Sequence, residues 1–307
     1  MSYTLLAGGT GAAKFLRGLC RVVAPEDLTI IVNTGDDWVV WGLSVSPDLD
    51  TVTYTLAGAG DPRRGWGLRG DTFHCLSAMG RLGLETWFQL GDGDLATHLY
   101  RTRRLAQGAT LSAVTAEIAA AFGLRARLAP MSDQPVRTRI LTRRGELEFQ
   151  TWFVKRRARD AVIGVRYAGA PQARPSPGVS EAIERARAVL ICPSNPLISI
   201  GPILAVPGIR EALGATRAPV LAVSPIVGGQ ALKGPAARMM KSMGMAPSAV
   251  QVARLYEDFL DILVLDNADR SLAPAVEALG IRAVVTNTIM SGRRRKKALA
   301  CAVLEAL

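Results

Sequence analysis

The chain has 307 residues, of which 49% are hydrophobic and 21% charged, so it can bury a large core as one α/β domain or as a core with an insertion. This composition excludes a mainly disordered protein, and no apolar run in the sequence approaches the roughly 20 residues that cross a bilayer. Lys and Arg outnumber Asp and Glu by 37 to 26, which gives a net charge of +11. The only dense basic run, Arg293 to Lys297, has no interleaved aromatic residues and indicates a solvated helix face, so we expect no nucleic-acid partner.

The start of the chain, "MSYTLLAGG", lacks the basic segment and the cleavage site of a signal peptide. The four cysteines are far apart and form no CxxC pair, which predicts reduced thiols. We therefore expect a cytoplasmic protein that does not bind a membrane.

Two parts of the chain share one pattern, in which a short apolar run ends in a polar turn and an amphipathic segment follows. This pattern is typical of βα units on a parallel sheet whose two faces are covered by helices. It predicts strands at residues 3–7, 28–33, 188–192, 220–224, 262–266 and 282–286. Between these parts, residues 71–122 have a helical pattern, and a period of two around Arg144 and Gly145 predicts a β-hairpin.

These patterns predict an α/β fold, a Rossmann-like three-layer α/β/α structure with a parallel sheet and an α+β insertion. The expected core is 1–70 with 179–307, and the expected insertion is 71–178. In such a sheet, ligands bind beyond the carboxyl ends of the strands.

The first turn, in "LLAGGTGAAKFLRG", places Gly8, Gly9, Thr10 and Gly11 between a strand and a helix. It matches neither the dinucleotide fingerprint nor the Walker loop. Even so, the glycine N–H groups, the helix N-terminus and the charge of Lys14 can bind an anion. The alternative is a plain tight turn.

Four carboxylates follow in "NTGDD" and "SPDLD", namely Asp36, Asp37, Asp48 and Asp50. Carboxylates beside a phosphate site hold hard cations such as Mg²⁺, although Asp is also common in helix caps and turns. A further cluster, "LGDGDLATHLYRT", puts Asp94, His98 and Arg101 on one helix face that could bind a polar substrate, with capping by Asp92 or Asp94 as the alternative.

Two loops after later strands carry small polar residues and prolines. "CPSNPLISIGPIL" contains Ser194, Asn195 and Ser199, and "SPIVGGQALKGPA" contains Ser224 and Gly228. Loops of this kind can wrap a phosphate with backbone N–H groups.

These motifs are joined by four others, "WGLRGDTFHCL", "PMSD", "FQTWFV" and "YEDFLDILVLDNAD". Together they run in order through nearly the whole chain, and in this combination the sequence resembles the CofD/FbiA family of 2-phospho-L-lactate transferases. The resemblance implies transfer of a phospholactyl, phosphoenolpyruvyl or related phospho-acid group. The donor is the GMP anhydride of that acid, the acceptor is the ribityl hydroxyl of the deazaflavin Fo, and GMP is released in coenzyme F-420 biosynthesis. It also implies Mg²⁺ and a homodimer. Gly93 stands where the family usually has Arg.

The resemblance also implies site roles. Donor binding falls to Gly8, Gly9, Thr10, Gly11, Lys14, Asn33, Ser194, Asn195, Ser199, Ser224 and Gly228. The Fo side comprises Asp50, Gln89, Asp92, His98 and Arg101, and Trp66 and Trp87 could stack on the ring. Catalysis is assigned to Asp36, Asp37 and Asp50 and metal binding to Asp37 and Asp48, with the choice of base left open.

The main alternative function is a sugar-nucleotide-binding regulator similar to the YvcK-like family, which shares the GGTG turn but performs no transfer. An NAD-dependent oxidoreductase is disfavoured, because the second predicted strand ends in Asn33 and not in an acidic residue.

Overall fold

The computed structural model describes residues 2–307. Its centre is a seven-stranded parallel sheet in the order β14-β13-β10-β9-β1-β2-β5. The strands are β1 (Tyr3–Ala7), β2 (Leu28–Val32), β5 (Arg127–Pro130), β9 (Ala188–Ile191), β10 (Val220–Val223), β13 (Ile262–Asp266) and β14 (Arg282–Thr286). All six strands predicted from the apolar runs are present, each ending within one residue of its expected limit.

The seventh strand, β5, was not predicted. It lies within the expected insertion and pairs in parallel with β2. The division of the chain into a core and an insertion therefore stays a prediction, with one strand of residues 71–178 belonging to the central sheet.

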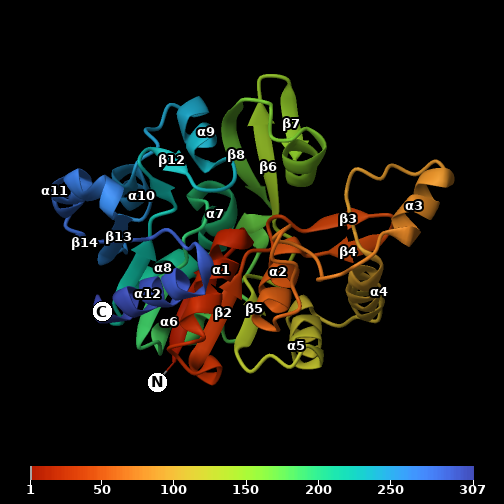
Figure 1. Ribbon diagram of the computed structural model, residues 1–307, viewed down its shortest axis with the longest axis horizontal. Helices are drawn as coiled ribbons and strands as arrows, with labels where there is room; N and C mark the ends of the chain where they lie inside the picture. Colours follow the sequence, from red (N-terminus) through yellow and green to blue (C-terminus); the bar gives the residue numbers. More distant parts are fainter. Residues whose placement is uncertain (1) are drawn as a thin grey trace.

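Helices cover both faces of this sheet, which confirms the three-layer Rossmann-like architecture (Figure 1). Alternate residues of each strand point to opposite faces, so Leu5 and Ile30 pack in one core while Leu6 and Ile31 pack in the other. The first core is covered by α1 (Gly9–Leu19), α2 (Pro47–Leu56) and α12 (Gly292–Glu305). The second is covered by α6 (Val179–Glu184), α7 (Gly201–Leu204), α8 (Ile209–Ala215), α9 (Ala236–Ser242), α10 (Ala249–Leu255) and α11 (Ala273–Glu277).

The predicted hairpin is confirmed as β6 (Arg137–Thr142) and β7 (Gly145–Glu148), and β8 (Val162–Ala168) completes an antiparallel sheet in the order β7-β6-β8. The predicted helical region contains α3 (His74–Arg81), α4 (Asp92–Ala106) and α5 (Leu111–Ala121). Two small hairpins lie in loops of the core, β3 (Trp38–Val40) with β4 (Leu43–Val45) and β11 (Ile226–Val227) with β12 (Gln230–Ala231). The β3–β4 hairpin and α3 extend at one end of the molecule, on the right of Figure 1.

Five short helical turns complete the chain. They are η1 (Pro25–Asp27), the π-helix η2 (Thr151–Lys155), η3 (Ala170–Gln172), the π-helix η4 (Pro196–Ile200) and η5 (Asn267–Leu272). Within residues 2–307, no single helix is long and apolar enough to span a membrane. Two consecutive helical segments, Pro196–Leu204 and Ile209–Ala215, would together have the length and composition of a span, but the chain bends by 84° between them.

The strand order sets the position of the ligand site. The chain places β2 and β5 on one side of β1, then returns to place β9 on its other side and continues outward. In sheets of this kind the reversal leaves a crevice at the carboxyl ends of the two strands where it occurs. Here those strands are β1 and β9, and they lead directly into the Gly8–Gly11 turn and the Pro193–Ser199 loop.

Candidate functional site

A cavity of about 1100 Å³ lies at this crevice. It is larger than the range of roughly 300–1000 Å³ that is usual for a small-molecule site, so it has room for two ligands. Its lining includes most of the predicted site residues, namely Gly8, Gly9, Thr10, Gly11, Lys14, Asp36, Asp48, Asp50, Gln89, His98, Ser194, Asn195, Ser199 and Ser224. Residues as far apart in the sequence as Gly8 and Ser224 thus share one space.

The loops after β1 and β9 form a cradle of small residues, defined here as Gly8–Gly11 with Ser194–Ser199. Ser194 Oγ donates a hydrogen bond to the Gly8 carbonyl oxygen at 2.8 Å. A Cβ atom at Gly11 would lie 2.3 Å from the Pro193 carbonyl oxygen, and one at Gly8 would lie 2.8 Å from Ser199 Cβ. The two loops can therefore approach this closely only because both positions are glycine.

The cradle has free donors and positive charge. Helix α1 begins at Gly9 without a side-chain cap and has no acidic residue in its first turn. The Gly9 N–H is directed at the Asp48 carboxylate, and the N–H groups of the next residues are available to an anion. Lys14 lies one turn further on and is half-buried. Burial, with repulsion from Lys233, lowers the pKa of Lys14. An anion bound here would relieve that repulsion.

Next to the cradle, the first turn of α2 brings two carboxylates into the cavity. Pro47 starts this helix, where its missing N–H costs nothing, and Asp48 and Asp50 follow on the same turn. Asn33 Nδ2 donates a hydrogen bond to Asp48 Oδ2 at 2.9 Å. Burial raises the pKa of Asp48 to about 6, although this hydrogen bond opposes the shift.

Two further carboxylates follow β2. Burial and the neighbouring charge of Asp48 raise the pKa of Asp36 well above its usual range. Burial likewise raises the pKa of Asp37 to about 7, with Arg137 and Arg101 opposing the shift. One buried oxygen of each group, Oδ1, has no hydrogen-bond partner among residues 2–307. These two oxygens can therefore accept a hydrogen bond or bind a cation.

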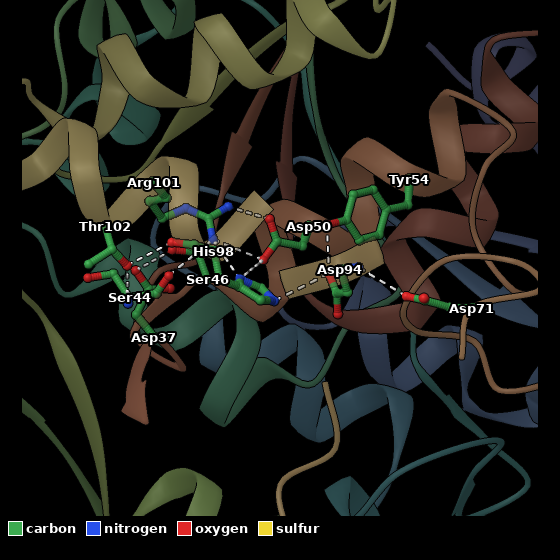
Figure 2. Close-up of polar contacts among 10 residues, drawn as sticks. All are labelled: Asp37, Ser44, Ser46, Asp50, Tyr54, Asp71, Asp94, His98, Arg101 and Thr102. Atoms are coloured by element: carbon green, nitrogen blue, oxygen red, sulfur yellow. Dashed lines mark hydrogen bonds and ion pairs between the residues drawn. The ribbon is translucent and has the colours of Figure 1, made fainter. Parts of the chain in front are cut away.

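A buried polar network connects the cavity to α4 (Figure 2). Arg101 forms a two-pronged ion pair with Asp50, in which Nη2 contacts Oδ1 and Nη1 donates to Oδ2 at 3.2 Å. Arg101 Nη1 also lies 3.2 Å from His98 Nδ1. Because a guanidinium can only donate, this contact requires Nδ1 to be an acceptor and places the ring proton on Nε2.

The network continues on the other side of the imidazole ring. His98 Nε2 lies 3.3 Å from Asp94 Oδ1, without the alignment of a hydrogen bond. Tyr54 donates to the same oxygen at 2.7 Å, and Asp71 accepts from the Asp94 backbone N–H at 3.0 Å. Asp50 and His98 are therefore held in fixed orientations at the cavity wall by residues behind them.

Five of the predicted site residues do not line the cavity. Three of them lie behind the lining and contact residues at or near it. Asn33 donates to Asp48, Asp37 accepts from Ser46, and Arg101 donates to Asp50. Asp92 accepts the N–H groups of His74 and Cys75, both at 2.9 Å, and so caps the start of α3, which was the alternative given for it. Gly228 donates its N–H to both oxygens of Asp269 at 3.1 Å.

The cavity also has lining residues to which the sequence analysis gave no role. Phe88, Phe149 and Phe153 form an aromatic wall together with Trp87, which was expected to stack on the ring, and the rings of Phe149 and Phe153 stack with centroids 5.3 Å apart. Gln150 joins this wall to the carboxylates, because its Nε2 donates to the Asp36 carbonyl oxygen at 2.9 Å. Further lining residues are Arg64, Lys155, Arg157, Thr288, Ile289, Met290 and Ser291. The motif "FQTWFV" marked part of this wall, whereas the loop after β14 gave no signal.

No three His, Cys, Asp or Glu side chains within residues 2–307 converge as a preformed metal site. Mg²⁺ needs less than that, because it binds through one or two carboxylates and takes its other ligands from water and substrate oxygens. Asp36 and Asp48 line the cavity beside the cradle and lack a cationic partner, so these two residues fit such an ion. Asp37 does not line the cavity, although its Oδ1 is also unpartnered.

Comparison with known proteins identifies the family. The family model described as 2-phospho-L-lactate transferase CofD matches residues 4–303. A 2-phospho-L-lactate transferase of Methanosarcina mazei is 42% identical over 302 residues, which cover 98% of this chain and 99% of that protein. A phosphoenolpyruvate transferase of Streptomyces griseus is 43% identical over 311 residues, which cover 99% of this chain and 98% of that protein.

A solved structure of a Bacillus halodurans protein covers 99% of both chains with a TM-score of 0.65 and 16% identity, a likeness that concerns the fold alone. The family match over nearly the whole length and the two end-to-end relatives agree with the family predicted from the motifs. The chain belongs to the CofD family of 2-phospho-L-lactate transferases.

Proposed function

We propose that the protein transfers a phospholactyl, phosphoenolpyruvyl or related phospho-acid group from its GMP anhydride to the ribityl hydroxyl of Fo, with release of GMP, in coenzyme F-420 biosynthesis. Membership of the family supports this class of reaction. The observation that carries the proposal is that three carboxylates, those of Asp36, Asp48 and Asp50, line the same cavity as the phosphate cradle. A protein that only bound a nucleotide would have no need of them.

The donor occupies the cradle side of the cavity. Backbone N–H groups at the start of α1 and the ammonium of Lys14 bind the diphosphate, because they place donors and positive charge where its negative charge lies. Ser194 holds the two loops of the cradle together through its hydrogen bond to the Gly8 carbonyl oxygen. Asn195, Ser199 and Ser224 lie on the neighbouring loops and contact the rest of the GMP moiety. Asn33 contributes indirectly, by holding Asp48 in place.

The acceptor occupies the side with the aromatic wall. The flat deazaflavin ring packs on Trp87, Phe88 and Phe153, while Gln89 and His98 supply polar contacts. Asp50 accepts a hydrogen bond from a ribityl hydroxyl next to the one that attacks. Because Arg101 holds both oxygens of Asp50, the carboxylate has one fixed orientation, and such positioning is the main requirement for phosphoryl transfer.

In the reaction, the ribityl oxygen attacks the phosphorus of the phospho-acid group. The bond from this phosphorus to the bridging oxygen breaks, and GMP leaves with that oxygen. The hydroxyl proton passes to Asp36, which lines the cavity and whose Oδ1 has no hydrogen-bond partner among residues 2–307. A Mg²⁺ ion held by Asp48 and the donor would offset charge on the diphosphate.

The identity of the phospho-acid is a separate question. Relatives called 2-phospho-L-lactate transferase and relatives called phosphoenolpyruvate transferase are about equally similar to this chain, at 42% and 43% identity. The acids differ by so few atoms that one polar contact could discriminate them. Mass spectrometry of the product formed from an equimolar mixture of phospholactyl, phosphoenolpyruvyl and phosphoglyceryl donors would decide this point.

The reaction itself is tested by incubating the purified protein with Mg²⁺, Fo and each GMP-activated donor. We expect GMP and the phosphodiester of Fo to form together. Tight binding of a UDP-sugar without turnover of any donor would favour the regulator instead. Homodimer formation and cytoplasmic location stay predictions, the first of which analytical ultracentrifugation can test.

A further inference from the structure

A second, smaller pocket opens beside the main cavity, between α1, α2, α12 and the loop around Gly65. Its volume is about 80 Å³. One water molecule needs roughly 10–15 Å³, so the pocket can hold a phosphate-sized anion with some of its water. Six residues line both spaces, namely Thr10, Lys14, Thr51, Tyr54, Trp66 and Gly67.

Three cations from two helices line this pocket. Lys14 and Arg17 lie one turn apart on α1, and Lys296 comes from α12, which lies beside α1 in Figure 1. All three side chains are half-buried, whereas the other basic residues of the Arg293–Lys297 run are exposed. A Cβ atom at Gly18 would lie 2.3 Å from the Lys296 carbonyl oxygen, so the two helices are in close contact at this point.

None of these three cations has a carboxylate within 4.0 Å in the described part of the chain. Asp61 is the acidic residue of the pocket lining, but it accepts from Arg64 Nε at 3.0 Å and from the Arg63 backbone N–H at 2.7 Å. Burial and repulsion from Arg17, Lys14 and Arg21 lower the pKa of Lys296. The folded protein therefore brings like charges together without compensating them.

We propose that this pocket binds a small anion of the phosphate class, at the same time as the main cavity holds its nucleotide ligand. Phosphate is a suitable ligand, because one such ion can accept hydrogen bonds from Arg17 and Lys296 and also from the hydroxyls of Thr51 and Thr55. The site differs from the cradle, since its lining contains Arg17, Thr55 and Lys296 and none of Gly8, Ser194 or Ser199, although Thr10 lines both spaces. Lys14 contributes to both sites.

Isothermal titration of the full chain with inorganic phosphate tests this proposal. The titration is repeated in saturating GDP, which fills the cradle. The variants are Arg17→Gln and Lys296→Gln, and Arg294→Gln is the matched control, because it removes one charge from the exposed surface of α12. Circular dichroism and thermal melting show whether each variant is folded, and Arg17→Lys, which keeps the charge, should retain binding.

We expect one phosphate to bind in the presence of GDP. Its dissociation constant should rise roughly tenfold or more in Arg17→Gln and in Lys296→Gln, because each loses a charged hydrogen bond, and should stay unchanged in Arg294→Gln. Loss of phosphate binding when GDP is added would overturn the proposal, as would equal dissociation constants in wild type, Arg17→Gln, Lys296→Gln and Arg294→Gln. If GDP itself fails to bind, the nucleotide assignment of the main cavity is wrong, and the comparison among the variants still decides the phosphate site.

Discussion

The buried ion pair between Arg101 and Asp50 leads to a strong prediction about stability. Arg101 is 2% exposed and Asp50 is 5% exposed, so neither charge is solvated once its partner is removed. Breaking one side of such a pair costs roughly 3–5 kcal/mol. Substitution Arg101→Met also removes the donor to Ser44 and His98, so we expect a loss of about 4 kcal/mol in the free energy of unfolding.

The double variant Arg101→Met with Asp50→Asn separates charge from packing. Removing both charges together leaves no buried ion without a partner, and the loss should fall to about 1–2 kcal/mol. Urea unfolding at pH 7.5 is measured for wild type, Arg101→Met, Asp50→Asn and the double variant, and an unchanged m-value supports the comparison. Arg104→Met is the matched control on the same helix, where the ion pair with Glu117 is partly exposed and a much smaller effect is expected. If the double variant loses as much as the two single variants added together, the pair is not coupled and our account of the network is wrong.

Three further predictions concern the cavity and a carboxylate behind its lining. Lys14→Ala should raise the KM for the donor by roughly tenfold or more and change the KM for Fo little; the reverse pattern in steady-state kinetics would remove Lys14 from the donor site. Gly11→Ala should weaken donor binding, because its Cβ would lie 2.3 Å from the Pro193 carbonyl oxygen, whereas Gly214→Ala, with its nearest neighbour at 4.0 Å, should bind normally in a titration. In the metal-free protein the pKa of Asp37 is about 7, against an ordinary 3.8. The folded protein therefore holds this proton more tightly than the unfolded chain does, so the free energy of unfolding is highest at acid pH and falls as the pH rises to 7. Because Asn does not titrate, the free energy of unfolding of Asp37→Asn should rise by about 3 kcal/mol relative to that of wild type between pH 5 and pH 8, measured by urea unfolding with a chelator. Parallel pH curves for the two proteins would contradict the raised pKa.

Much of the central sheet could be predicted from the sequence, because strands buried on both faces are continuous apolar runs. Strand β5 escaped prediction because "RLAP" has four residues, includes Arg127 and Pro130, and follows directly after a helical region. It was recognisable only from its pairing with β2, which is a long-range contact. The third strand of the small sheet, β8, was missed for a related reason, since Gly164 and Arg166 interrupt its apolar pattern.

The candidate site was predictable where it depends on the strand ends. The loops after β1 and β9 lie side by side, as expected for the carboxyl edge of a parallel sheet. The aromatic wall was not predictable to the same degree, because it brings together two segments far apart in the sequence, Trp87–Phe88 and Phe149–Phe153, through long-range packing. Asp92 shows the limit of sequence motifs, since a carboxylate that looked suited to a ligand serves as a helix cap.

The rate of transfer in a single turnover tests the central claim most directly, namely that Asp48 and the cradle act together on one donor. The measurement compares wild type with Asp48→Asn, at saturating Mg²⁺, Fo and donor, and follows GMP and the Fo phosphodiester over time. We predict equal amounts of both products from wild type and a rate at least about a hundredfold lower in Asp48→Asn, with donor binding largely retained. Transfer at the wild-type rate by Asp48→Asn, or release of GMP by wild type without formation of the phosphodiester, would contradict the account.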